Sequence, residues 1–250
     1  MNKDQALPTS RVLIERVAVT TVLTLARPDK LNALDERLVD ELIAAFDEAA
    51  RDGTRLCVIR GQGKGFSGGF DFSDLERQTD GDLALRFLRV ETMLQRIHHA
   101  PFVTMALVHG ACFGAAADVV AACTHRVASS GATFRMPGLR FGIALGTRRL
   151  AELIGRDAAF DMLQTSKVID ANRALADGLL TRIEEQDAWP QLIDEAAKAA
   201  AVLPPSSLHR LLDLTRQDQR DADLAALARS VTEPGLKSRI AAYLASLKRS

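Results

Sequence analysis

The first 189 residues alternate between short apolar runs and helical stripes of apolar residues. Residues 56–60 and 102–108 have the length and composition of buried strands. Between them, apolar residues recur every three or four positions from Leu83 to Ile97, which predicts a helix. The other expected strands are residues 12–14, 17–25, 126–130, 133–136 and 180–183. Strands that alternate with helices in this way indicate an α/β fold with parallel pairing.

The composition changes at Pro190. From there onward, Ala, Leu, Lys, Arg and Asp recur at helical spacing, and proline pairs or Pro-Gly interrupt the pattern. We therefore expect a core formed by residues 1–189 and a C-terminal helical region formed by residues 190–250.

The charge balance and the cysteines argue against several classes of protein. Lys plus Arg and Asp plus Glu both number 32, so no net charge would draw the chain to nucleic acid or to an anionic membrane. The three cysteines form no CxxC or Cys/His cluster, which predicts no metal site and favours a reduced, cytoplasmic interior. The N-terminus has no apolar segment typical of a secretory signal. The apolar stretch 101–123 is interrupted by His109 and Asp118, so we expect a buried strand and a buried helix there rather than a membrane span.

A glycine-rich loop follows the strand at 56–60, and its sequence, GQGKGFSGGFDF, fits three interpretations. Residues 63–68 match GxGxxG, a dinucleotide-binding pattern. Residues 65–69 match GxSxG, the nucleophile elbow of serine hydrolases, with Ser67 as the nucleophile. In the third interpretation, the loop offers backbone N–H groups to an oxyanion and needs no side-chain nucleophile.

The position of the next helix weakens the first two interpretations. Both require a helix to begin directly after the glycines. Here Ser73 and Glu76 have the spacing of a capping box, so the next helix is expected at Ser73 and not earlier. The acidic residue that a dinucleotide site needs further along would be Glu91, but Glu91 lies inside a helical stripe.

A second glycine segment favours the oxyanion interpretation. Residues 109–118 follow the buried strand at 102–108, turn at 110–114 and open an apolar helix. The first N–H groups of a helix have no partner within it, and the positive end of the helix dipole lies behind them. One N–H from each glycine segment could hold a single carbonyl oxygen as it becomes an enolate.

These segments resemble the enoyl-CoA hydratase/isomerase (crotonase) superfamily. RPDKLNAL at 27–34 is similar to its RPxxxNAL motif, GFSGGFD at 65–71 to its FSAGxD motif, and TRRL at 147–150 to part of its GTQRL motif. The resemblance implies a crotonase-type spiral of ββα units with a C-terminal helical region. It also implies an acyl-CoA thioester substrate, no cofactor beyond the coenzyme A of that substrate, and assembly as a homotrimer or hexamer.

The resemblance also implies the site residues. Phe70 and Ala115 would supply the oxyanion N–H groups, and Asp118 stands where the family has a catalytic glutamate. The residues expected to bind the substrate are Lys30, Ala33, Gly68, Asp71 and Gly114. Asp118 could instead be an ion-pair partner for Arg126, but a carboxylate among apolar residues is costly without a partner, and burial raises its pKa towards the range of a proton-transfer group.

One family feature is missing. The second glutamate of true hydratases follows a proline, and here Pro137 is followed by Gly138 in a shortened loop. A single carboxylate can still move a proton along an enolate, so isomerisation of a double bond fits better than hydration of an enoyl-CoA. A thioester hydrolase and a non-catalytic acyl-CoA-binding protein remain alternatives. His109 is expected to be a core residue at a strand end.

Overall fold

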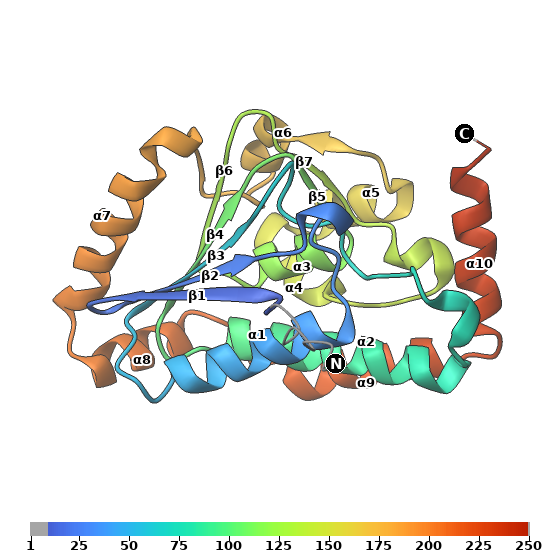
Figure 1. Ribbon diagram of the computed structural model, residues 1–250, viewed down its shortest axis with the longest axis horizontal. Coiled ribbons are helices and arrows are strands. Elements are labelled where there is room, and N and C mark those ends of the chain that lie inside the picture. Colours follow the sequence, from blue (N-terminus) through green and yellow to red (C-terminus); the bar gives the residue numbers. More distant parts are fainter. Residues whose placement is uncertain (1–9, 250) are drawn as a thin grey trace, which may run out of the picture.

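The computed structural model describes residues 10–249 and places most of the strands in one twisted sheet (Figure 1). The strands of this sheet, in spatial order, are β1 (Val12–Val17), β2 (Thr20–Leu25), β3 (Leu56–Gly61), β4 (Val103–Val108), β6 (His125–Ala128) and β9 (Arg182–Ile183). The pair β1–β2 is antiparallel and the other pairs are parallel. A smaller sheet contains β5 (Ala111–Phe113), β7 (Thr133–Arg135) and β8 (Ile169–Asp170), in that order.

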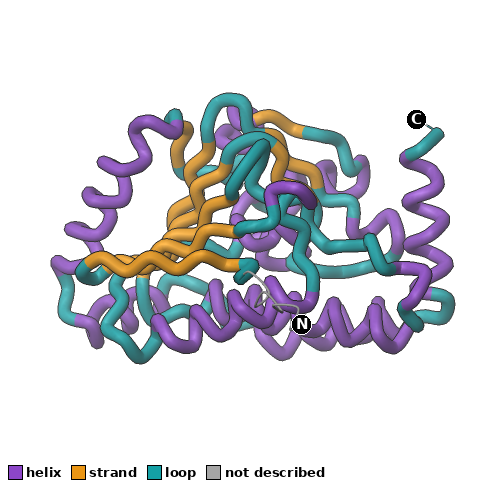
Figure 2. The backbone as a smooth tube through the Cα atoms, in the orientation of Figure 1, coloured by secondary structure: helices purple, strands orange, loops and turns teal. Residues whose placement is uncertain are grey.

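Both faces of the central strands are covered, as expected for parallel strands that are apolar throughout. In β4 every residue is buried. One face packs against α1 (Glu36–Ala49) and α2 (Asp80–His98) within the main apolar core. The opposite face packs against α7 (Trp189–Val202) and α8 (Pro205–Leu214) in a second apolar cluster. Figure 2 shows the helices on the two sides of the central strands.

Most expected elements are present, and the start of α1 shows why. The side chain of Asp35 accepts a hydrogen bond from the Leu38 N–H and caps the helix, a position that aspartate favours. The apolar stretch 101–123 is the strand β4, the short strand β5 and the buried helix α3 (Ala115–Ala121), as the interrupted pattern indicates. None of the helices between residues 10 and 249 combines the length and hydrophobicity that a membrane crossing needs.

The prediction that a helix starts at Ser73 is wrong. Only a short 3₁₀ turn, Leu75–Arg77, lies there, and α2 begins at Asp80 with a capping box between Thr79 and Asp82. Ser73 does not cap a helix because it bonds to Asp71 instead. Its N–H and its hydroxyl both donate to the Asp71 carboxylate, at 2.9 and 2.6 Å.

Two smaller expectations also need correction. The strand expected over residues 17–25 is divided by a turn at Ala18, whose positive φ of 51° ends β1. The turn expected over residues 110–114 contains β5, which pairs in parallel with β7. That pairing is formed with residues 22 positions away, so no local pattern reveals it.

The remaining helices lie in the second half of the chain, and the last two pack against the main core. The remaining helices are α4 (Thr147–Ile154), α5 (Arg156–Thr165), α6 (Ala171–Ala176), α9 (Arg220–Thr232) and α10 (Leu236–Leu247). From α9 and α10, Leu227, Ile240 and Tyr243 join the main apolar core, so the C-terminal helices share their packing with the body of this chain. The boundary expected at residue 190 stays a prediction.

Candidate active site

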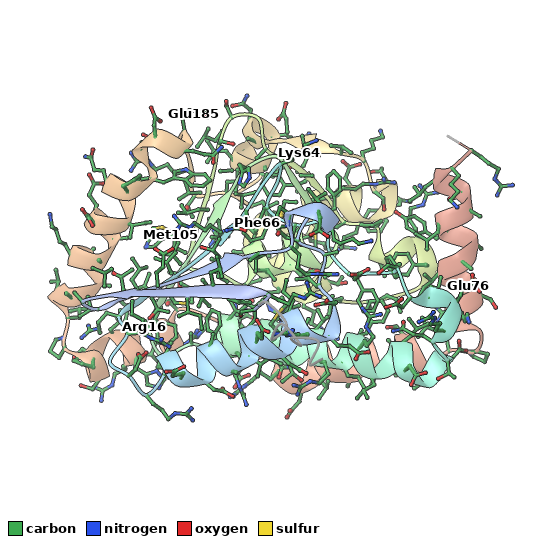
Figure 3. The ribbon with its side chains drawn as sticks, in the orientation of Figure 1. Arg16, Lys64, Phe66, Glu76, Met105 and Glu185 are labelled. Atoms are coloured by element: carbon green, nitrogen blue, oxygen red, sulfur yellow. The ribbon has the colours of Figure 1, made fainter. Side chains whose placement is uncertain are left out.

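Hydrogen bonds that involve the buried residues Phe66 and Asn32 fix the glycine-rich loop. Phe66 is fully buried, and its N–H donates to His109 O at 2.8 Å (Figure 3 labels Phe66 inside the molecule, with exposed Lys64 nearby). The buried side-chain amide of Asn32 donates to the carbonyl oxygens of Gln62 at 2.8 Å and Phe66 at 3.0 Å. Asn32 was not assigned a role from the sequence, although it belongs to the RPDKLNAL segment. Its side chain fixes the shape of the loop by bonding to backbone carbonyls of the loop.

The loop touches the start of α3 because Gly69 has no side chain. A Cβ atom on Gly69 would lie 2.3 Å from Phe113 O and 3.3 Å from Ala115 N, and its φ of +84° is in the region that favours glycine. This close approach brings the backbone of Phe70 next to the backbone of Ala115.

The N–H groups of Phe70 and Ala115 are both available. Leu34 bonds to the peptides on either side of Phe70, donating to Gly69 O at 2.8 Å and accepting from Asp71 N at 3.2 Å. The N–H of Phe70 therefore points away from Leu34. Ala115 is the first residue of α3, where an N–H has no partner within its helix. The two donors line one cavity, the arrangement that stabilises an oxyanion.

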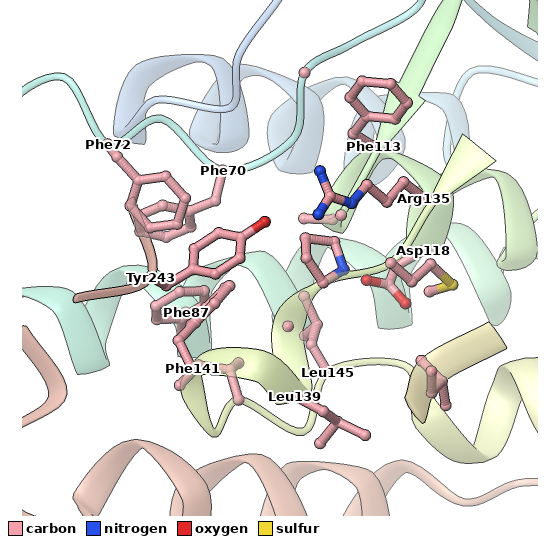
Figure 4. Close-up of a pocket in the computed structure, with 18 of the residues that line it drawn as sticks. Phe70, Phe72, Phe87, Phe113, Asp118, Arg135, Leu139, Phe141, Leu145 and Tyr243 are labelled. Atoms are coloured by element: carbon pink, nitrogen blue, oxygen red, sulfur yellow. The ribbon is translucent and has the colours of Figure 1, made fainter. Parts of the chain in front are cut away.

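This cavity encloses about 250 Å³ and is largely apolar (Figure 4). The aromatic residues that line it are Phe70, Phe72, Phe87, Phe113, Phe141 and Tyr243. The rings of Phe70 and Phe87 stack with centroids 4.1 Å apart, and the guanidinium of Arg86 lies 4.2 Å from the centroid of the Phe70 ring. These contacts hold Phe70 in place and with it the N–H that it offers.

Asp118 lies at the cavity, and its carboxyl has no protein partner for Oδ1 among residues 10–249. The residue is 3% exposed. Burial raises the pKa of Asp118 well above its usual value; the positive charge of Arg149 opposes this shift, and the negative charge of Glu91 adds to it. The guanidinium of Arg149 is already engaged by Glu91 at 2.9 Å and by Asp223 at 3.3 Å. Asp118 is therefore a buried acid with a cation nearby but without an ion-pair partner.

The alternative role for Asp118, as the partner of Arg126, is not what the structure shows. Arg126 instead donates to the carbonyl oxygens of Leu179, Cys123 and Thr124. Gly146 covers the Asp118 carboxyl closely, since a Cβ atom there would lie 2.0 Å from Oδ1.

The residues expected to bind the substrate lie in three different settings. Gly68 and Gly114 line the cavity with Phe70, Ala115 and Asp118. Lys30 is exposed and Ala33 is half-buried, and neither lines the cavity. Asp71 forms an ion pair with Arg27 at 2.8 Å, and both side chains are 8% exposed. Burial alone would raise the pKa of Asp71, but hydrogen bonds from Ser73 and Arg27 outweigh it and lower the pKa.

Three further positions limit the chemistry. Ser67 is fully buried; its hydroxyl donates to Asn32 O at 2.7 Å and accepts from Gly69 N at 3.1 Å, so it is not placed as a nucleophile. His109 has its Nε2 within 2.9 Å of Gly63 O, which agrees with a core residue. Gly138 lines the cavity without a side chain, so no second carboxylate stands there. Among residues 10–249, no cluster of His, Cys, Asp and Glu is arranged to hold a metal ion.

The sequence model of the family described as enoyl-CoA hydratase/isomerase matches residues 15–243. The chain belongs to this family. It is therefore an acyl-CoA-processing enzyme of the hydratase or isomerase type, and its expected crotonase fold is confirmed.

Relatives within the enoyl-CoA hydratase/isomerase family carry out both kinds of reaction. The Delta(3,5)-Delta(2,4)-dienoyl-CoA isomerase of Dictyostelium discoideum is 31% identical over 200 residues, which are 74% of this chain and 68% of that protein. The 2,3-dehydroadipyl-CoA hydratase of Escherichia coli (strain K12) is 30% identical over 224 residues, 88% of this chain and 87% of that protein. A crystal structure from Bordetella parapertussis, named as an enoyl-CoA hydratase/isomerase, has a TM-score of 0.94 and 46% identity, and covers 95% of this chain and 99% of that one.

Proposed function

We propose that this enzyme moves the double bond of an enoyl-CoA thioester, with Asp118 as its only catalytic carboxylate. The single observation that carries the proposal is the contrast at the cavity: Asp118 is present and unpaired, and Gly138 provides no second acid. Addition of water by two carboxylates needs one group to activate the water and another to transfer a proton. Double-bond migration needs one group that takes a proton and returns it.

The N–H groups of Phe70 and Ala115 would hold the thioester oxygen. The Asp118 carboxylate removes a proton from the α-carbon of a 3-enoyl thioester, and the electron pair moves to the carbonyl oxygen as a dienolate. The carboxyl then returns the proton to the γ-carbon, which gives the 2-enoyl thioester. The raised pKa of Asp118 supports this role, since a group that is both acid and base works best when its pKa lies near the operating pH.

Coenzyme A would enter as part of the substrate, with no other cofactor. Gly68 and Gly114 would contact the thioester arm, while Lys30 and Ala33 would lie along the rest of coenzyme A. Asp71 contributes by holding Arg27 beside the loop.

We further propose that the enzyme is a cytoplasmic homotrimer or hexamer that binds neither nucleic acid nor membrane. Large apolar side chains lie on its surface, among them Phe160 at 64% and Leu214 at 79% exposed, which supports burial against other copies. The cysteines Cys57, Cys112 and Cys123 are free and buried, in keeping with a reducing compartment. Light scattering of the purified enzyme tests the assembly, and a monomer would contradict it.

The experiment that tests the reaction is a panel of 2-enoyl- and 3-enoyl-CoA thioesters incubated with the purified enzyme and followed by mass spectrometry. Migration of the double bond leaves the mass unchanged and shifts the 3-enoyl thioester to the elution time of the 2-enoyl isomer when chromatography precedes the mass spectrometer. A gain of one water would show hydration, release of free coenzyme A would show hydrolysis, and binding without any product would show a non-catalytic acyl-CoA-binding protein.

A further inference from the structure

An arginine without an ion-pair partner among residues 10–249 lines the cavity near the expected oxyanion donors. The side chain of Arg135 makes one hydrogen bond within residues 10–249, from Nε to Ser166 O at 2.9 Å. Its two terminal nitrogens have no protein acceptor there, and no carboxylate of the described chain forms an ion pair with them. Arg135 and Asp118 are the only charged residues among those that line the cavity.

Arg135 is half-buried, and three other buried or half-buried arginines have a carboxylate or backbone carbonyls as partners for at least one terminal nitrogen. Arg27 pairs with Asp71 at 2.8 Å, and Arg149 pairs with Glu91 at 2.9 Å. Within the described part of the chain, Arg126 has no carboxylate partner, but its guanidinium donates to three backbone carbonyls. Arg149 also has one unpartnered terminal nitrogen, Nη1, whereas in Arg135 neither terminal nitrogen has a protein partner among residues 10–249. A cation beside an apolar cavity is costly unless an anion accompanies it.

The small sheet fixes the direction of Arg135. In the parallel pair β5–β7, Arg135 is in register with Phe113, so the two side chains leave the sheet on the same face. Figure 4 shows the guanidinium below the Phe113 ring, with its terminal nitrogens turned away from Asp118. The backbone of Arg135 is also close to the oxyanion donors, because Arg135 O accepts the N–H of Gly114 at 2.7 Å, and Gly114 precedes Ala115.

Asp118 is not the anion for this cation. Among residues 10–249, Oδ1 of Asp118 has no hydrogen-bond partner, and the one hydrogen bond of the Arg135 side chain goes to Ser166 O. The terminal nitrogens of Arg135 are therefore available to an anion of a ligand in the cavity.

We propose that Arg135 is a specificity residue that binds an anionic group of the thioester substrate through its two terminal nitrogens. Two anions can serve: a carboxylate on the acyl group, or a phosphate of coenzyme A. The acyl carboxylate agrees better with the position, because Arg135 is one hydrogen bond and one residue away from Ala115, whereas the pantetheine arm separates the phosphates from the thioester. The inference rests on the proposed function in taking the thioester to lie at Phe70 and Ala115.

The test measures the dissociation constants of matched thioesters by titration calorimetry for the wild type, Arg135→Met and Arg135→Lys. The anionic ligands are malonyl-, glutaryl- and adipyl-CoA, and the neutral ligands of equal carbon number are propionyl-, pentanoyl- and hexanoyl-CoA. The same acyl groups on pantetheine, which lacks the phosphates, complete the set. Binding of the neutral ligands also reports whether each variant is folded.

For Arg135→Met we expect binding of at least one carboxyacyl-CoA to weaken by about 10- to 100-fold, the usual effect of lost charge-assisted hydrogen bonds. The loss should persist with the matching pantetheine thioester, be absent for the neutral ligands, and be partly recovered in Arg135→Lys. A loss for every coenzyme A thioester that disappears on pantetheine would assign the phosphate as the anion.

Equal affinities in the wild type and Arg135→Met for all ligands, or an equal loss for neutral and anionic pantetheine thioesters, would overturn the proposal. Arg140→Met is the matched control, since Arg140 is an exposed arginine five residues further along that does not line the cavity. If it weakens the carboxyacyl thioesters as much as Arg135→Met does, the effect is one of general charge, and the proposal is wrong. A wild type that binds no thioester would contradict the proposed function as well. Normal thioester binding by the wild type, with no difference between anionic and neutral ligands on changing Arg135, would contradict this inference alone.

Discussion

Asp71 and Asp118 are both buried aspartates beside glycine-rich segments, and the sequence placed both of them at the site. Their surroundings differ. The Asp71 carboxylate receives hydrogen bonds from Arg27 at 2.8 Å and from Ser73 at 2.6 and 2.9 Å, and its pKa is lowered. The Asp118 carboxyl has an unpartnered Oδ1 at the wall of a cavity, and burial raises its pKa.

The difference shows how one residue type can serve either structure or proton transfer. A carboxylate with a cation and several donors is held in its charged form and gains nothing by taking a proton. A carboxyl that burial makes weakly acidic, and that still faces a ligand cavity, can exchange a proton with a substrate. The predictions below test this division, beginning with the largest expected effect.

The division fails if Asp118→Asn leaves the chemistry intact. We expect this change to slow deuterium exchange at the α-carbon of a bound thioester by about 10²- to 10⁴-fold, as loss of a general base typically does. Thioester affinity should change little, because Phe70 and Ala115 hold the carbonyl through backbone atoms. Exchange is followed by mass spectrometry, and affinity by calorimetry. Equal exchange rates in the wild type and the variant would make Asp118 a structural residue.

Asp71→Asn should show the reverse pattern. The change breaks the buried ion pair and leaves Arg27 with Asp35, at 3.3 Å, as its remaining carboxylate. Breaking a buried pair typically costs up to about 3–5 kcal/mol of stability. Urea denaturation measures this loss. The exchange rate per folded molecule should stay within a few-fold of the wild type at a temperature where the variant is folded. A variant of unchanged stability that has lost exchange would reverse the roles of the two aspartates.

The pH dependence of stability should separate the two residues by sign. A carboxyl with a raised pKa contributes stability that is fully present below its usual value of 3.8 and is lost as the pH rises through the raised pKa. Asp118→Asn should therefore melt higher than the wild type near pH 7, by a few degrees, and the difference should vanish towards pH 4.

For Asp71, whose pKa is lowered, the stability is present above 3.8 and is lost as the pH falls through the lowered pKa. The loss of stability caused by Asp71→Asn should therefore become smaller at acidic pH. Melting curves from pH 3 to pH 8 give both trends, and parallel curves for the three proteins would contradict the assignment.

Ser67→Ala should have the smallest effect on turnover. Its hydroxyl bonds to Asn32 O and Gly69 N beneath the loop, so the change should lower stability by about 1–2 kcal/mol and leave activity within a few-fold. A loss of about three orders of magnitude, or a covalent adduct on Ser67 with a fluorophosphonate probe, would support a nucleophile and a hydrolase instead.

Much of the fold could be predicted because its signals are local. Asp35 caps α1 through a bond to Leu38, only three residues away. The start of α2 could not be predicted in the same way. Ser73 and Glu76 have the spacing of a capping box, but both donors of Ser73 bond to the Asp71 carboxylate. That carboxylate is held in place by its ion pair with Arg27, which is distant in the sequence.

The sequence by itself determined the order of the main-sheet strands, the two glycine segments, the single carboxylate at position 118 and the missing one at position 138. These follow from residue type and from spacing over a few positions. The tertiary structure decided which aspartate is paired and which arginine is not. Arg27 meets Asp71 across 44 residues, and Arg135 reaches the cavity because β5 and β7 pair. Burial and charge compensation depend on every segment that packs around a group, and spacing along the chain does not specify those segments.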